Sequence, residues 1–136
     1  MMITLPSRLA PLIEQRVSEL RDSTDTGPLG EDYRSIAIHY GALPLYADIG
    51  GCIALKPTGE WLFFHSNQRW NPPEEVEPLD ANAWRAQALR VGSKKYPELA
   101  EMLPRRPDGA RDCEPCSGRG HFGSRDCAWC GGLGWR

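Results

Sequence analysis

The sequence lacks the features that mark several large classes of protein. No apolar run approaches the ~18 residues of a membrane-spanning helix, and no phosphate-binding loop, dinucleotide fingerprint or nucleophile elbow is present. The N-terminal segment carries Pro6, Arg8 and Pro11 where a signal peptide needs an unbroken apolar stretch. These absences predict a cytoplasmic protein that does not contact a membrane and is not an enzyme.

A strong charge of either sign is also missing. The formal net charge is −2 and the isoelectric point is about 5.9. Domains that bind nucleic acid commonly have isoelectric points above ~9, because they must neutralise phosphates. The charge of the whole chain therefore predicts a protein partner and no nucleic-acid partner.

The first two thirds of the chain show the pattern of a small mixed domain. Apolar residues at spacings of three and four predict a helix over residues 7–21. Short segments rich in β-branched and aromatic residues follow, separated by turn residues such as Gly59, and they predict an antiparallel meander of three or four strands. The segments are SIAIHY (35–40), LPLYAD (43–48), CIALKP (52–57) and WLFFHS (61–66).

Two further helices are expected before the C-terminal tail. Asp80 can cap a helix over residues 81–91, which Gly92 ends. Pro97 then opens a second short helix that Pro104 stops. The predicted fold class is α+β, in the order N-terminal helix, antiparallel β-meander, two C-terminal helices and a small cysteine-rich tail. The predicted divisions are an α+β domain at 1–104, a linker at 105–112 and a tail at 113–136.

The tail contains a repeat of C-x-x-C-x-G-x-G with an offset of 14 residues. Two thiols three positions apart can bind one ion from a tight turn, and the glycines that follow allow amide N–H groups to approach the sulfurs. Two such turns, here called the first knuckle (residues 113–120) and the second knuckle (residues 127–134), supply four sulfurs. Four sulfurs match a closed tetrahedral zinc site, so the tail is predicted to be a zinc-knuckle tail. We therefore expect one structural zinc ion held by Cys113, Cys116, Cys127 and Cys130.

Other roles for these thiols stay open at this point. The same four sulfurs suit iron, and paired cysteines can form a redox dithiol. A catalytic zinc is disfavoured, because such sites keep an open coordination position and usually include histidine or carboxylate ligands. His121 lies between the pairs and is expected at the surface, since four thiols suffice. Cys52 stands alone among apolar residues and is expected in the core.

The doubled motif resembles the cysteine-rich zinc domain of DnaJ-type co-chaperones. The resemblance extends from Cys113 to Gly134, about a sixth of the chain. That family carries four repeats and two zinc ions, so two repeats imply one zinc ion. The His-Pro-Asp motif of the J-domain is absent from this sequence. The resemblance thus implies a metal site rather than co-chaperone activity.

A second resemblance concerns the stretch GALPLYADIGGCIALKPTGEWLFF. It is similar to the central sheet of bacterial SMI1/KNR4-type (SUKH) proteins, and the residues that carry the similarity are Asp48, Gly50, Gly51, Gly59 and Glu60. The resemblance implies an α+β protein-binding module. Many bacterial members of that family are immunity proteins that neutralise secreted toxins.

A cluster of acids is the candidate partner-binding site. Glu74, Glu75 and Glu77 follow two prolines and could form an edge for a basic partner, although charge runs more often simply face water. The overall expectation is a non-catalytic protein-binding module with one structural zinc ion. The alternative is a chaperone-like or thiol-redox protein that acts through the cysteine-rich tail.

Overall fold

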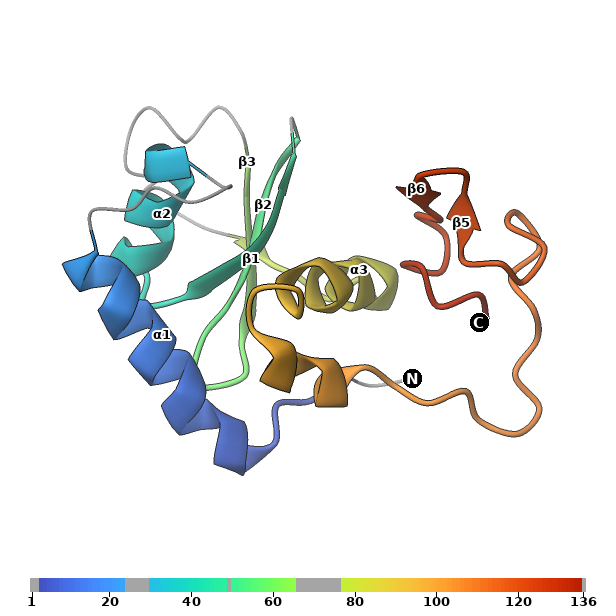
Figure 1. Ribbon diagram of the computed structural model, residues 1–136, viewed down its shortest axis with the longest axis horizontal. Helices are drawn as coiled ribbons and strands as arrows, with labels where there is room; N and C mark the ends of the chain where they lie inside the picture. Colours follow the sequence, from blue (N-terminus) through green and yellow to red (C-terminus); the bar gives the residue numbers. More distant parts are fainter. Residues whose placement is uncertain (1–2, 24–29, 49, 66–76, 136) are drawn as a thin grey trace. The chain divides into compact units, whose positions relative to one another are not determined.

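The computed structural model describes residues 3–23, 30–48, 50–65 and 77–135 (Figure 1). The chain divides into two compact units: Thr4–Asp80, here called the sheet unit, and Ala81–Arg136 with Met1–Ile3, here called the cysteine unit. Within the described ranges, no helix is both long and apolar enough to cross a membrane.

The sheet unit combines helices with one antiparallel sheet, and the predicted α+β class is confirmed (Figure 1). The strands are hydrogen-bonded in their sequence order, β1-β2-β3-β4, as a meander. The elements are a 3₁₀-helix η1 (Ser7–Leu9), α1 (Ala10–Asp22), α2 (Gly30–His39), β1 (Leu43–Asp48), β2 (Gly51–Leu55), β3 (Trp61–His65) and β4 (Glu77–Pro78).

The segment SIAIHY is helical, so its prediction as a strand was wrong. Residues 35–39 of this segment lie in α2, which begins at Gly30. Alternating isoleucines favour a strand locally, but Tyr33, Ile36 and Ala37 recur at helical spacing and are all buried. Burial of that face outweighs the β preference of the isoleucines, because intrinsic propensities are weaker than packing.

The hairpin between β2 and β3 forms as predicted. Gly59 has a φ of +91° and its amide donates to the carbonyl of Lys56 at 2.9 Å. The amide of Lys56 donates in turn to the carbonyl of Glu60 at 3.0 Å. The turn between β1 and β2 is held by Asp48, whose Oδ1 accepts the amide of Gly50 at 2.7 Å. These two turns fix the register of β1, β2 and β3.

Helix α2 and strands β2 and β3 contribute to one buried cluster. Strand residues two positions apart point to the same face of a sheet, so Cys52 with Ala54 and Leu62 with Phe64 share this face. Cys52 is fully buried, and burial together with the charge of Asp48 raises the pKa of its thiol. Cys52 is therefore a neutral core residue, as expected. The cluster comprises Tyr33, Ile36, Ala37, Ala42, Cys52, Ala54, Leu62 and Phe64.

The cysteine unit contains α3 (Asn82–Gly92), a 3₁₀-helix η3 (Pro97–Met102) and a hairpin of β5 (His121–Phe122) and β6 (Arg125–Asp126). The predicted cap by Asp80 was wrong, because the residue at the N-cap position is Ala81, which makes no side-chain capping hydrogen bond. Helix α3 starts one residue too late for Asp80 to occupy the capping position. The predicted division into a domain at 1–104, a linker at 105–112 and a tail at 113–136 is a statement about independent folding, and it stays a prediction. In the structure, α3 belongs to the same compact unit as the tail.

Replacing Phe64 with alanine should destabilise the sheet unit strongly. Its ring is 1% exposed and lies 5.9 Å from the ring of Tyr33, so truncation leaves a cavity in the core. We expect a loss of about 3–5 kcal/mol in the free energy of unfolding. The neighbouring Phe63 points to the other face and is only partly buried, which makes Phe63→Ala the matched control. Equal losses in denaturant titrations of the two variants would contradict this assignment of faces.

Candidate metal centre

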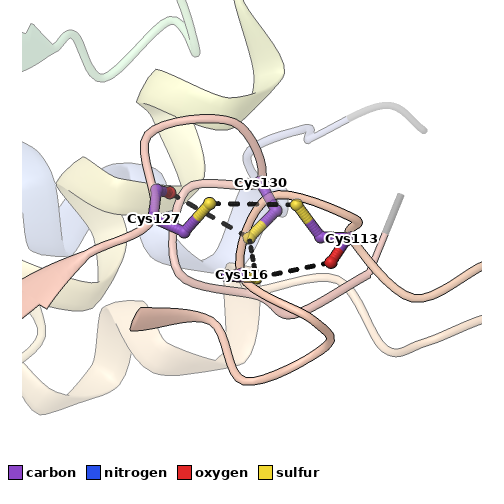
Figure 2. Close-up of side chains that lie close together, drawn as sticks. All are labelled: Cys113, Cys116, Cys127 and Cys130. Carbon is purple, nitrogen blue, oxygen red and sulfur yellow. Dashed lines mark hydrogen bonds between the residues drawn. The ribbon is translucent and has the colours of Figure 1, made fainter. Parts of the chain in front are cut away.

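The four tail cysteines converge on one point (Figure 2). Their sulfur atoms all lie within 4.8 Å of one another, and the residues are between 0% and 3% exposed. No cysteine of the chain forms a disulfide. The structure therefore brings together all four predicted ligands, in a cluster that can hold a metal ion.

The spacing of the sulfurs fits a tetrahedral ion. The Sγ atoms of Cys113 and Cys127 are 3.8 Å apart, and those of Cys116 and Cys130 are 3.9 Å apart. In a regular tetrahedron with Zn–S bonds of ~2.3 Å, neighbouring sulfurs lie about 3.8 Å apart. The two measured separations match this value, so an ion of that size fits between the two pairs.

The two halves of the site repeat one another in their backbone hydrogen bonds. The amide of Gly118 donates to the carbonyl of Cys113 at 3.0 Å, and the amide of Gly132 donates to that of Cys127 at 3.1 Å. The halves also exchange bonds, from the amide of Cys127 to the carbonyl of Gly120 and from the amide of Cys113 to that of Gly134. The repeat in sequence is thus a repeat in structure, with each half supporting the other.

The amide of the last glycine of each motif donates a hydrogen bond to one cysteine sulfur. The amide of Gly120 donates to the sulfur of Cys116, and the amide of Gly134 donates to that of Cys130, both at 3.2 Å. Both glycines have positive φ, +81° and +84°. A Cβ atom on Gly120 would lie 2.5 Å from the carbonyl oxygen of Gly132. Glycine is therefore required both for the backbone conformation and for the close approach of the two halves.

Burial and hydrogen bonding act on the thiols in opposite directions. Desolvation by burial raises the pKa of Cys113 to about 12 and also raises the pKa of Cys130. At Cys116 burial is outweighed by the amide of Gly120 and by the neighbouring thiols, which lower its pKa to about 7. Without an ion Cys113 and Cys130 are therefore protonated at neutral pH. A cation that binds four thiolates must displace these protons.

Two arginine–aspartate pairs support the site, and sequence reasoning missed both. The Arg90 guanidinium of α3 donates to the carboxylate of Asp126 at 3.1 Å and to the carbonyl of Gly132. Arg106 binds Asp112 at 2.7 Å. Each aspartate directly precedes the first cysteine of a motif, so the full repeat is R-D-C-x-x-C-x-G-x-G. The repeated Arg-Asp dipeptide was the signal that could have indicated these positions.

Among the described residues, the cysteine cluster does not include the other candidate residues. His121 is exposed in β5 and does not belong to it, in agreement with its expected surface position. Glu77 is exposed in β4, where its carboxylate lies 3.5 Å from Nε2 of His65. Glu74 and Glu75 lie outside the described residues. The proposed acidic edge therefore stays a prediction.

Comparisons with known proteins add no relatives. No family model matches the chain, and neither the curated proteins nor the solved structures give a match. The resemblances to DnaJ-type zinc domains and to SMI1/KNR4-type proteins therefore stay predictions. The metal centre rests on the geometry of this chain alone.

Replacing Gly120 with alanine should weaken metal binding. The new methyl group would collide with the carbonyl of Gly132 and disturb the amide that donates to Cys116. Gly123 is the matched control, because it also has positive φ (+60°) but nothing lies within 4 Å of its added Cβ. We expect at least tenfold weaker metal affinity for Gly120→Ala than for Gly123→Ala in a chelator competition assay. Similar affinities in the two variants would contradict the proposed packing of the halves.

Metal affinity should fall as the pH is lowered. Cys113 and Cys130 have raised pKa values, so both are protonated near neutral pH and each must lose a proton on binding. At least two protons are released per ion, which predicts a loss of affinity of at least about 100-fold per pH unit near neutrality. Isothermal titration in buffers of different ionisation enthalpy counts these protons. Release of fewer than two would show that the two thiols are not both ligands.

Proposed function

We propose that this chain is a non-catalytic protein-binding module whose cysteine unit is stapled by one structural zinc ion. The observation that carries the proposal is the closed donor set, four sulfurs that are 0–3% exposed and supported by backbone amides. An ion with four sulfur ligands has no open position at which to activate water. The metal then supports folding, and the function belongs to the protein surface.

Zinc is the ion that this donor set favours. Thiolate ligands in a tetrahedral arrangement select zinc or iron among the common cellular metals. Zinc has no redox chemistry and its d-electrons impose no preferred geometry. It therefore suits a small structural site whose role is to hold two turns together.

The sheet unit supplies the proposed binding surface. Residues 1–80 contain 12 of the 18 acids but only six of the 16 lysines and arginines, which is a net charge of −6. This excess favours a basic protein partner, because complementary charge accelerates association. Glu77 is exposed in β4 and belongs to the proposed acidic edge, for which the sequence also offers Glu74 and Glu75. An immunity-type role in the bacterial cytoplasm, as the SMI1/KNR4 resemblance implies, fits such a partner.

A second candidate function is thiol-redox chemistry at the tail. It is favoured by the short distances between sulfurs of different halves, 3.8 and 3.9 Å, since these pairs could be joined after loss of the ion. The two functions differ in their response to a glutathione redox buffer. A structural zinc site keeps its metal and four reduced thiols over the cytoplasmic range of potentials. A redox site releases the metal and forms disulfides within that range.

Neutralising the acidic edge should slow association with the partner. We expect Glu74→Gln with Glu75→Gln and Glu77→Gln to lower the association rate constant several-fold at low salt, and less at high salt, because salt screens exposed charges. The partner is first obtained by affinity capture from the source cells. The matched control removes three exposed charges from α1, in Glu14→Gln with Glu19→Gln and Asp22→Asn. Equal rates for the two triple variants would exclude this edge as the interface.

A further inference from the structure

The charge of the chain is divided unevenly between its two units. Residues 81–136 hold ten of the 16 lysines and arginines but only six of the 18 acids, a net charge of +4. A zinc ion with four thiolates would contribute −2, but those sulfurs are buried. The whole-chain charge of −2 therefore conceals a cationic surface on the cysteine unit. The expectation that nucleic acid is no partner came from the whole-chain value alone.

The acids beside the knuckles are already neutralised. Asp126 is paired with Arg90, and Asp112 is paired with Arg106. Arg119 and Arg125 are both exposed, and neither forms an ion pair with another residue in the described part of the chain. The Nε of Arg119 donates to the carbonyl of Cys116, which orients its guanidinium beside the first knuckle. These two arginines remain available to an external anion.

Exposed aromatic rings accompany these cations. Among the described residues, the large hydrophobic side chains that are exposed are all aromatic and all lie in the cysteine unit: Trp84, Phe122 and Trp129. Phe122 and Arg125 are directly opposed across the β5–β6 hairpin. Opposed residues of an antiparallel pair lie on the same face, so this ring and this guanidinium are neighbours.

Trp129 has the most exposed of these rings, at 63%. It lies between Cys127 and Cys130 in the second knuckle, where the first knuckle has Pro115. Bonds from Gly132 to Cys127 and from Leu133 to Cys130 close this turn, so the backbone that presents the ring is fixed. An exposed ring on a rigid support loses little entropy when a flat group stacks on it.

We propose that the cysteine unit binds single-stranded nucleic acid. Bases stack on Trp129 and Phe122, and the guanidinium groups of Arg119 and Arg125 contact the phosphates. Cationic grooves with stacking aromatic rings are the general means by which proteins bind single strands. Among the neighbours of the two rings in sequence, those that are exposed include no large apolar residue: they are His121, Gly123, Ser124, Arg125 and Ala128.

The test uses the full-length chain loaded with metal. Its probes are fluorescein-labelled oligouridylate and oligothymidylate of 15 nucleotides, with blunt duplex DNA and polyglutamate as comparison anions. We expect fluorescence anisotropy to show binding of both single strands at 50 mM salt, and weaker binding of the two comparison anions. Affinity should fall with salt, because each phosphate contact contributes about −0.7 to the slope of log K against log salt.

Variants separate stacking from charge. Trp129→Leu should weaken binding about 5- to 100-fold, because one stacked base is lost, whereas Trp129→Phe should retain most of the affinity. Arg125→Ala should reduce the salt slope by about 0.7, whereas Arg21→Ala, an exposed change of equal charge in α1, should leave the slope unchanged. Metal content of each variant confirms that the knuckles are intact.

Three results would overturn the proposal. The first is the absence of binding of either oligonucleotide at 50 mM salt and a protein concentration of about 100 µM. The second is equal binding of polyglutamate, which would indicate an acidic protein segment as the occupant. The third is full affinity in Trp129→Leu, which would indicate apolar contact rather than stacking. None of these results affects the proposed role of the sheet unit, which is tested with a different partner.

Discussion

The tail at 113–136 depends on one constraint: four thiols with no disulfide among them form a buried cluster, against which Leu133 packs. Sulfurs at 3.8 and 3.9 Å have the separation of ligands around one tetrahedral ion, so a cation between them can stabilise them as thiolates. The hairpin β5–β6, the positive-φ glycines and the bonds exchanged between the halves all hold these sulfurs in place. Small units of this kind commonly obtain their stability from the metal itself.

The metal centre is also connected to the helical part of the same unit. Arg90 on α3 reaches both Asp126 and the backbone of Gly132, so α3 is fixed to the second knuckle. Gly131 approaches the backbone of Ala83 so closely that any side chain there would collide with it. Loss of the ion should therefore loosen α3 as well as the tail. The predicted boundary near residue 104 would then separate elements that act together.

Local patterns predicted the parts of this protein that depend on near neighbours. The cysteine spacing indicated the four ligands, and Gly59 indicated the hairpin, because both signals lie within a few residues of the structure they produce. The strand prediction for residues 35–40 failed because Tyr33, Ile36 and Ala37 were not weighed as one helical face. The contact of Arg90 with Asp126 spans 36 residues, and no local pattern places them together. The uneven charge was visible in the sequence, but it gained meaning only when the two units were distinguished.

The most direct test of the account is the metal content of the intact protein. Native mass spectrometry of chain purified without chelator should show one zinc ion per molecule. The quadruple variant Cys113→Ser, Cys116→Ser, Cys127→Ser and Cys130→Ser should show none, whereas Cys52→Ala should keep the ion. A metal-free wild-type chain whose four tail thiols react freely, or a chain that loses its ion on mutation of Cys52, would contradict the account.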